Sequence, residues 1–335
     1  MATLSTLRQA QQARDLFAPV SGRLGEVERF LDREMAAAPE MVRRVAGYVL
    51  ESGGKRLRPA LVLLVSRMLG ADGDRDVRYG AVVELIHTAT LLHDDIIDGA
   101  DLRRGRPSAN NRWGNQAAVL VGDWLYSRTM DLGLEVGDVE VMRRLVSATL
   151  QMTEGEILAD SVRGALDVTD DQYMEISRRK TAELFAAACS LPALYAPATG
   201  RHDETLSSFG RDLGICFQLV DDLLDFTSDR RRLGKPVMAD LREGRATLPI
   251  ILLLERQGDP GLRRRLAAVA SSGRFDEIAE EEVLDRLREV GALESTRQRA
   301  RSYGERASRR IAELPEGPER EILARAAQIL VDRTV

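Results

Sequence analysis

Residues 91–107 read LLHDDIIDGADLRRGRP. Three aspartates, Asp94, Asp95 and Asp98, follow an apolar helical turn, and a run of arginines begins a few residues later. On a helix, residues four apart lie one above the other, so Asp94 and Asp98 form a stripe of two carboxylates. Because like charges at this spacing destabilise a helix by about 0.2–0.5 kcal/mol, the stripe indicates a site that binds a cation.

A second acidic cluster, FQLVDDLLDF at 217–226, repeats this spacing with Asp221, Asp222 and Asp225. Apolar residues flank both clusters, so neither helix is expected to be a solvated charged surface. One such cluster could be a polar helix end that faces water, but two clusters, each followed by a basic loop, favour a function. Carboxylate oxygens suit Mg²⁺, which binds one or two carboxylates together with the phosphates of a substrate.

Basic side chains occur in four clusters along the chain. Any one of them is typical of a solvated surface, but together they predict a site for two phosphorylated groups. Arginine binds phosphate through two nitrogens at once, and lysine acts as a point charge. The clusters contain Lys55, Arg56 and Arg58; Arg103, Arg104 and Arg106; Arg178, Arg179 and Lys180; and Lys235.

Helical periodicity recurs along nearly the whole chain, and no alternation of polar and apolar residues persists long enough to predict a strand. We expect one all-α domain over 1–335, with residues 1–20 frayed. Thr169 and Gln172 predict a capping box at the start of one helix. The expected helices cover roughly 22–37, 40–52, 58–70, 76–98, 112–133, 137–160, 170–195, 203–226, 248–257, 260–272, 276–290, 292–313 and 317–333.

Two polar loops, 99–110 and 228–249, are long for a compact helical domain, and each begins just after an acidic cluster. Loops of this length in compact domains are usually functional or disordered. Their position beside the aspartates supports a site that binds cations and phosphates.

The composition fits a soluble globular protein, with 44% hydrophobic and 30% charged residues. A net charge of −5 argues against a nucleic-acid-binding protein. No apolar run approaches the ~18–20 residues of a membrane span. The start, MATLSTLRQAQQARD, lacks the apolar segment of a secretory signal; it weakly resembles a transit peptide, and a short frayed end is preferred. Cys189 and Cys216 are expected to be buried, unpaired thiols, which fits a reducing cytoplasm.

Taken together, the motifs resemble the trans-isoprenyl diphosphate synthases of the polyprenyl synthetase family, above all the long-chain octaprenyl and decaprenyl diphosphate synthases. The resemblance covers nearly the whole chain and implies a single helical bundle around a deep central cavity, usually in a homodimer. It rests on segments that occur in the family's order: GGKRLRP, ELIHTATLLHDDIID, RRGRPSAN, AAVLVGDWLYSRT, EGEI, KTAELF, GICFQLVDDLLD, GKP and DLREGRATLP.

Residue by residue, the resemblance implies a role for each cluster. The six aspartates would bind Mg²⁺, three ions with substrate bound, against the diphosphate of an allylic substrate such as farnesyl diphosphate. Thr181 and Gln218 would steady a carbocation. The remaining diphosphate ligands would be Arg103, Lys180, Gln218 and Lys235 for the allylic substrate, and Lys55, Arg58, His87 and Arg104 for isopentenyl diphosphate.

The positions four and five residues before Asp94 set product length in this family, where a bulky side chain blocks the tunnel. Thr90 and Ala89 are small, so the resemblance implies an open tunnel and a long-chain all-trans product for a quinone side chain. An alternative is a floor elsewhere, formed by Trp124, Leu125 or Met130, which would give a shorter geranylgeranyl or farnesyl product.

Three positions depart from the family's pattern: Arg245 replaces a lysine, Met238 a glycine, and Ala159 a glutamine or aspartate. Three other functions are disfavoured. A metal-dependent phosphohydrolase of the HD type needs a differently spaced histidine, and a terpene cyclase has a different second metal motif. A regulatory subunit of a heteromeric synthase would be expected to lose an aspartate motif, and this chain keeps both.

Overall fold

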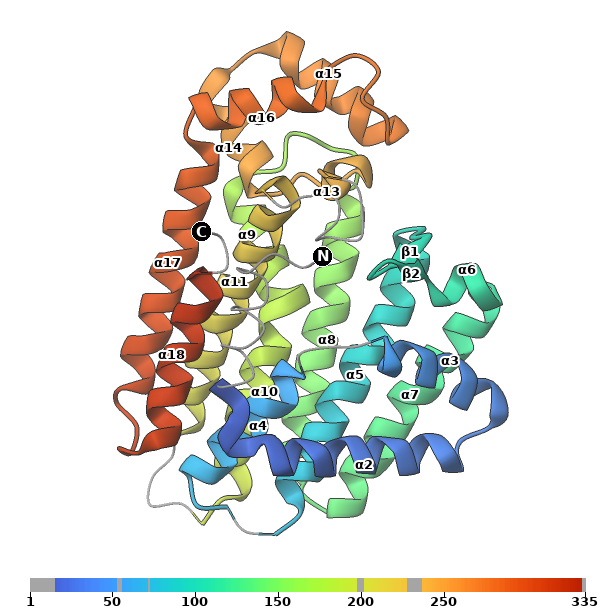
Figure 1. Cartoon of the computed structure of the whole chain (residues 1–335), viewed down its shortest axis with the longest axis vertical. Helices are drawn as coiled ribbons and strands as arrows, with labels where there is room; N and C mark the ends of the chain where they lie inside the picture. Colours follow the sequence, from blue (N-terminus) through green and yellow to red (C-terminus); the bar gives the residue numbers. More distant parts are fainter. Residues whose placement is uncertain (1–15, 53–55, 72, 198–201, 228–236, 333–335) are drawn as a thin grey trace.

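The computed structural model describes residues 16–52, 56–71, 73–197, 202–227 and 237–332, and it is almost entirely helical (Figure 1). This confirms the predicted all-α class. The elements in chain order are η1 (Ala18–Val20), α2 (Ser21–Ala37), α3 (Glu40–Glu51), α4 (Leu57–Met68), α5 (Arg75–Ile97), β1 (Leu102–Arg103), β2 (Arg106–Pro107), α6 (Ala109–Trp113), α7 (Asn115–Val136), α8 (Val139–Ser161), α9 (Asp170–Ser177), η2 (Arg178–Ala182), α10 (Glu183–Tyr195), α11 (Asp203–Thr227), α13 (Ala239–Arg242), α14 (Leu248–Gln257), α15 (Pro260–Ser272), α16 (Glu280–Glu289), α17 (Ala292–Ile311) and α18 (Pro318–Asp332).

The helix α11 lies in the middle of the bundle and packs most extensively against α10 and α17. On its other side α10 contacts α4 and α8, and α5 packs against α4 and α7. In Figure 1 these long helices run along the molecule, while α2 crosses them at one end and α15 and α16 cover the other. Leucines such as Leu61, Leu85 and Leu213 are fully buried between them, and each contributes roughly 1.5–3 kcal/mol by leaving water.

Three predictions about local structure were wrong. The loop 99–110 contains an antiparallel pair of two-residue strands, β1 and β2, which are too short to show alternation in sequence. The helix predicted over 170–195 is interrupted by a π turn, η2. The helix predicted from 112 is two helices, because Gly114 has a φ of 85° and separates α6 from α7.

Other local predictions are confirmed. Thr169 and Gln172 form the capping box of α9: each side chain accepts a hydrogen bond from the other residue's backbone N–H, at 3.2 Å to Thr169 Oγ1 and 2.9 Å to Gln172 Oε1. Cys189 and Cys216 are buried free thiols, and burial raises the pKa of both. Within the described ranges, no helix combines the length and the apolar composition needed to span a bilayer.

The helices α10 and α11 approach closely because Gly210 has no side chain. A Cβ atom at this position would lie 2.4 Å from the carbonyl oxygen of Phe185 and 2.8 Å from the Cα of Ala186. Both of those atoms belong to the backbone of α10, so they cannot rotate away.

We therefore predict that Gly210→Ala destabilises the protein by about 1–3 kcal/mol through overpacking. Gly47→Ala in α3 is the control, because a Cβ there meets nothing within 4 Å. That variant should be more stable by about 0.4–1 kcal/mol, since alanine loses less backbone entropy on folding. Urea unfolding of both variants measures the two values, and equal effects would contradict the close contact.

Candidate active site

Both aspartate motifs lie at the C-terminal ends of long helices. Asp94 and Asp95 are in the last turn of α5, Asp98 caps that helix, and the second motif occupies the last turns of α11. The C-terminal end of a helix carries a partial negative charge, so carboxylates there are unfavourable unless cations compensate them. The two helix ends therefore require positive charge between them.

A cavity of about 340 Å³ lies between the two motifs. Ala89, Asp95, Arg104 and Asp225 are not among the residues that line it, and Lys55 and Lys235 lie outside the described residues. The predicted site residues that do line it are Arg58, His87, Thr90, Asp94, Asp98, Arg103, Lys180, Thr181, Gln218, Asp221 and Asp222. Predicted site residues from Arg58 to Asp222 thus meet at one cavity.

Arginines neutralise two carboxylates of the first motif. Arg103 bonds Asp95 Oδ1 through Nε at 2.7 Å and Nη2 at 2.6 Å. Asp98 accepts from Arg163 at 2.8 Å on one oxygen and from Arg245 at 2.9 Å on the other. Burial raises the pKa of Asp95, and Arg103 only partly opposes this. Burial also acts on Asp98, but Arg245 and Arg163 outweigh it and hold its pKa below the usual range.

The negative charge of Asp94 is compensated less directly than that of Asp95 and Asp98. Lys180 lies near it and forms an ion pair of 2.5 Å with Glu156. Burial, together with the negative charges of Glu156 and Asp98, raises the pKa of Asp94 to about 6 even though Lys180 opposes the shift. The ionised form of Asp94 is therefore disfavoured, first by burial and then by the neighbouring carboxylates.

The second motif belongs to a chain of hydrogen bonds. Thr181 Oγ1 donates to Gln218 Oε1 at 2.7 Å, Gln218 Nε2 donates to Asp222 Oδ1 at 2.7 Å, and the Tyr173 hydroxyl donates to the other Asp222 oxygen. Burial first, and then the nearby Asp240, raises the pKa of Asp222 to about 8 despite these donors. The hydrogen bonds fix the orientation of the Asp222 carboxyl group, while burial and Asp240 disfavour its ionised form.

Asp225 is used differently from the other predicted metal ligands. Its two oxygens accept the backbone N–H groups of Ala239 and Asp240, each at 3.1 Å, so it caps the short helix α13. Asp221, by contrast, is exposed and lines the cavity. A direct role for Asp225 as a metal ligand stays a prediction. In this structure its hydrogen bonds position α13, the helix that precedes Arg245.

Arg58 and His87 form a second polar region in the cavity lining. The Arg58 guanidinium stacks 4.6 Å from the centre of the Phe185 ring, and its buried Nε has no partner among the described residues. His87 lies nearby; burial and the charges of Arg58 and Arg104 hold its pKa well below the usual value, so the imidazole is neutral. An unsatisfied guanidinium nitrogen beside a neutral imidazole can donate hydrogen bonds to an anion.

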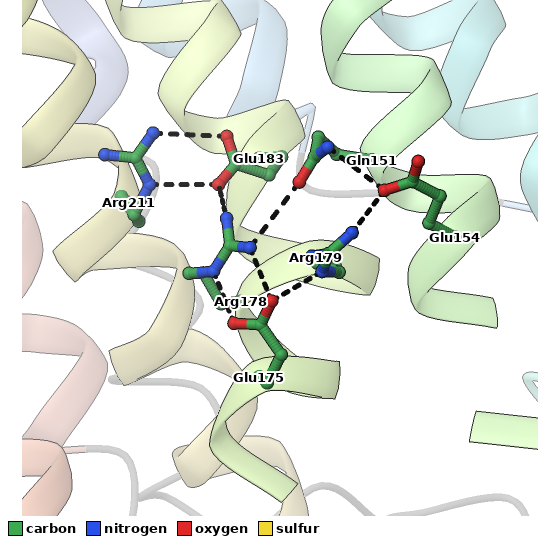
Figure 2. Close-up of polar contacts among 7 residues, drawn as sticks. All are labelled: Gln151, Glu154, Glu175, Arg178, Arg179, Glu183 and Arg211. Atoms are coloured by element: carbon green, nitrogen blue, oxygen red, sulfur yellow. Dashed lines mark hydrogen bonds and ion pairs between the residues drawn. The ribbon is translucent and has the colours of Figure 1, made fainter. Parts of the chain in front are cut away.

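The four basic clusters are divided by the fold, because neighbouring residues on a helix face different ways. Arg56 pairs with Glu28 and Glu84 instead of lining the cavity. Arg178 and Arg179 do not line the cavity and instead bond to a network of glutamates (Figure 2). Their role as phosphate ligands stays a prediction, and in this structure both guanidiniums are paired with glutamates.

Sequence reasoning missed three residues that act on the aspartates: Glu156, Arg163 and Tyr173. Glu156 lies within the motif EGEI, whose acidic residues were a usable signal. Arg163 and Tyr173 carry no such signal, because they reach Asp98 and Asp222 only through the folding of α8 and α9 against α5 and α11.

The donor set fits a hard divalent cation. The cavity brings carboxylate oxygens from two helices together, and two of those carboxyls have raised pKa values, first because of burial and then because of nearby negative charge. In the part of the chain that the structure describes, no three His, Cys, Asp or Glu side chains form a preassembled metal site. Mg²⁺ does not need one, since it binds through one or two carboxylates and completes its shell with phosphate and water.

An all-helical bundle with two carboxylate motifs facing one cation-lined cavity defines an enzyme that acts on diphosphates. The sequence model of the polyprenyl synthetase family matches residues 39–286, and the chain belongs to this family. Its members are metal-dependent prenyltransferases that condense isopentenyl diphosphate with allylic diphosphates.

Among curated proteins, the chain is 38% identical to the octaprenyl diphosphate synthase of Escherichia coli, over 88% of this chain and 90% of that one. It is 35% identical to a short chain isoprenyl diphosphate synthase of Methanothermobacter thermautotrophicus, over 91% and 94%. A crystal structure of a decaprenyl diphosphate synthase from Rhodobacter capsulatus has a TM-score of 0.89 and 35% identity, covering 96% and 99%. A polyprenyl synthase from Caulobacter crescentus, complexed with calcium and isoprenyl diphosphate, has the same TM-score and identity, covering 96% and 98%.

The raised pKa of Asp222 predicts how the stability of the metal-free protein depends on pH. Its folded-state pKa of about 8 exceeds the ordinary 3.8, so the native state holds a proton that the unfolded chain releases. The free energy of unfolding must then fall as the pH rises from the ordinary pKa of 3.8 to about 8. In the presence of a chelator, the stability of Asp222→Asn relative to wild type should therefore increase as the pH is raised from about 5 to about 9, because asparagine stays neutral. Urea unfolding of both proteins at each pH measures this difference. Parallel pH profiles for the two proteins would rule out Asp222 as the source.

Proposed function

We propose that this chain is a long-chain all-trans polyprenyl diphosphate synthase that extends an allylic diphosphate with isopentenyl diphosphate units. The observation that carries the proposal is the meeting of Asp94 and Asp98 with Asp221 and Asp222 around one cavity that Lys180 and other cations also line. This combination of charges suits a diphosphate held between two carboxylate motifs.

The allylic diphosphate would lie at the charged end of the cavity. Arg103 and Lys180 would bind its oxygens once substrate draws them away from Asp95 and Glu156, and Lys235 is proposed beside them. The aspartates would hold Mg²⁺, with three ions as the proposed number, and Mg²⁺ supplies positive charge that stabilises the leaving diphosphate. Isopentenyl diphosphate would bind at Arg58, His87, Arg104 and Lys55.

The reaction follows from these charges. The allylic carbon–oxygen bond breaks, the double bond of isopentenyl diphosphate forms a new carbon–carbon bond to the allylic cation, and a proton is lost to the released diphosphate. Thr181 donates its only hydroxyl hydrogen to Gln218, so its oxygen lone pairs are free to face the cavity. Such fixed dipoles stabilise the carbocation without reorganisation.

The product would be long because the cavity wall is open beside α5. Thr90 lines the cavity with a small side chain whose hydroxyl is tied to the His87 carbonyl at 2.8 Å. Ala89, at 3% exposed, lies behind the wall, so Thr90 is the position that matters. Leu91, Met152 and Phe217 give the wall an apolar surface for the growing hydrocarbon.

The first test is turnover of the purified protein with Mg²⁺, farnesyl diphosphate and labelled isopentenyl diphosphate, with mass analysis of the products. Asp94→Ala and Asp221→Ala should each lower turnover by about 10³-fold, because the leaving charge loses its support, while circular dichroism stays helical. Near-normal turnover in both variants would defeat the proposed metal site.

Product mass decides the second part of the proposal. Eight to ten isoprene units would agree with the open wall at Thr90, and a stop at four or five units would mean a shorter-chain synthase with a floor nearer the metals. No elongation from any allylic primer would instead favour a regulatory subunit of a heteromeric synthase.

We also propose that the chain works as a homodimer of single-domain subunits, located in the cytoplasm, where its unpaired thiols stay reduced. Exposed apolar residues support the dimer: Val139, Val146, Leu150 and Ile157 follow one another at intervals of seven, four and seven residues along α8. This spacing makes a continuous stripe on one helix face, and such a stripe usually marks an interface.

Leu150→Glu should therefore convert the dimer to a monomer, because a charge would enter the apolar stripe; sedimentation velocity measures the change. Met41→Glu is the matched control, since Met41 is 52% exposed, close to the 56% of Leu150, but lies on α3. A wild-type protein that is monomeric at micromolar concentration would refute the proposed dimer.

A further inference from the structure

The π turn η2 contains two adjacent pairs of residues that have different surroundings. Lys180 and Thr181 line the cavity, whereas Arg178 and Arg179 are not part of its lining. The two arginines instead belong to a polar network (Figure 2). This network joins residues from α8, α9, α10 and α11 around the turn. Its position raises the question of what it does for the two cavity residues.

Arg178 connects the helix before the turn to the helix after it. Its Nε and Nη2 bond the two oxygens of Glu175 at 2.8 Å and 2.7 Å, and its Nη1 bonds Glu183 at 2.6 Å. In an uninterrupted α-helix, residues five apart lie about 140° apart around the axis. A π turn bonds residues five apart and brings them to the same side, so the Arg178–Glu183 pair fits η2 and not an α-helix.

The far end of this connection is fixed. Glu183 is only 8% exposed, and Arg211 of α11 bonds both of its oxygens at 3.0 Å and 3.2 Å. Arg179 adds a link from the turn to Glu154 of α8. A buried carboxylate held by two guanidiniums has little freedom to follow the helix if the turn changes.

The backbone of the turn is also tightly enclosed. A Cβ at Gly155 of α8 would lie 2.6 Å from the backbone nitrogen of Lys180. A Cβ at Gly214 of α11 would lie 2.6 Å from the Cα of Ala182. The turn therefore sits between two glycines, and the Arg178 network closes it on the outer side.

We propose that Arg178 is a positioning residue: by bridging Glu175 and Glu183 it maintains the π turn that directs Lys180 and Thr181 into the cavity. Without the bridge the segment can return to α-helical geometry, which rotates one of these side chains out of the site. The inference rests on the proposed function, in which Lys180 holds the allylic diphosphate and Thr181 faces the carbocation.

The test compares Arg178→Met with Arg211→Met. Both remove one guanidinium from the same Glu183 carboxylate, but only the first removes the bridge across the turn. Arg178→Met should lower kcat/KM for the allylic diphosphate on the order of 100-fold, with KM for isopentenyl diphosphate unchanged, because a small misplacement of binding groups has that effect. Arg211→Met should retain nearly wild-type kinetics, and equal losses in both variants would overturn the proposal.

Hydrogen exchange gives a readout that needs neither substrate nor metal. In the metal-free protein, amides of a peptide over 175–186 should exchange faster in Arg178→Met than in wild type, while Arg211→Met leaves them unchanged. Unaltered exchange in Arg178→Met would show that the turn does not depend on the bridge.

A double-mutant comparison separates this inference from the proposed function. If Arg178 acts through the cavity pair, Arg178→Met should cost little more once Lys180→Ala and Thr181→Val are present. If Arg178→Met lowers kcat/KM in that background as much as it does in wild type, the inference about Arg178 is overturned, while the proposed function is unaffected. Normal kinetics in the Lys180→Ala and Thr181→Val variants would instead refute the proposed roles of those two residues.

If Arg178→Met does not fold, Arg178→Lys provides the decisive variant. A lysine keeps the positive charge but cannot bond Glu175 through two nitrogens and Glu183 through a third in the same planar geometry. An intermediate loss of allylic kcat/KM with a wild-type thermal midpoint supports the proposal, and wild-type kinetics overturn it.

Discussion

Two clusters of aspartate at the negative ends of two helices are the constraint on which the site depends. Each cluster opposes the helix dipole and its own neighbours, so it persists only where positive charge is supplied. Around the first cluster the protein supplies that charge from four different segments, through Arg103, Arg163, Lys180 and Arg245. Helix α5, the hairpin β1–β2, the segment after α8 and the turn before α14 are therefore held together by these ion pairs.

This arrangement sacrifices stability for function. Asp94 and Asp222 have raised pKa values because burial and like charge disfavour their ionised forms, and a divalent cation with a diphosphate would relieve both. Natural proteins retain such conflicts mainly at functional sites. The departure at Arg245 keeps a cation at this position and adds ion pairs to Asp98 and Asp240, so the site's charge balance is preserved.

Close helix packing provides the precision that loops alone would lack. Glycines in α8 and α11 let the backbone of α10 and of the π turn approach to van der Waals contact. That proximity places Thr181, Gln218 and Asp222 in one hydrogen-bonded chain, which begins on η2 and ends on α11. Side chains on rigid, tightly packed elements keep their orientation.

The sequence by itself determined the helical class, most helix limits and the acidic and basic motifs, because periodicity and charge spacing are local properties. It also pointed to Lys180, Thr181 and Gln218 through their resemblance to family motifs. Only the tertiary structure decided which neighbours face the cavity: Lys180 does and Arg178 does not, and Asp222 does while Asp225 caps α13. A π turn adds one residue to a helical turn, and Arg163 and Tyr173 reach their aspartates across helix contacts, so no local pattern could specify either.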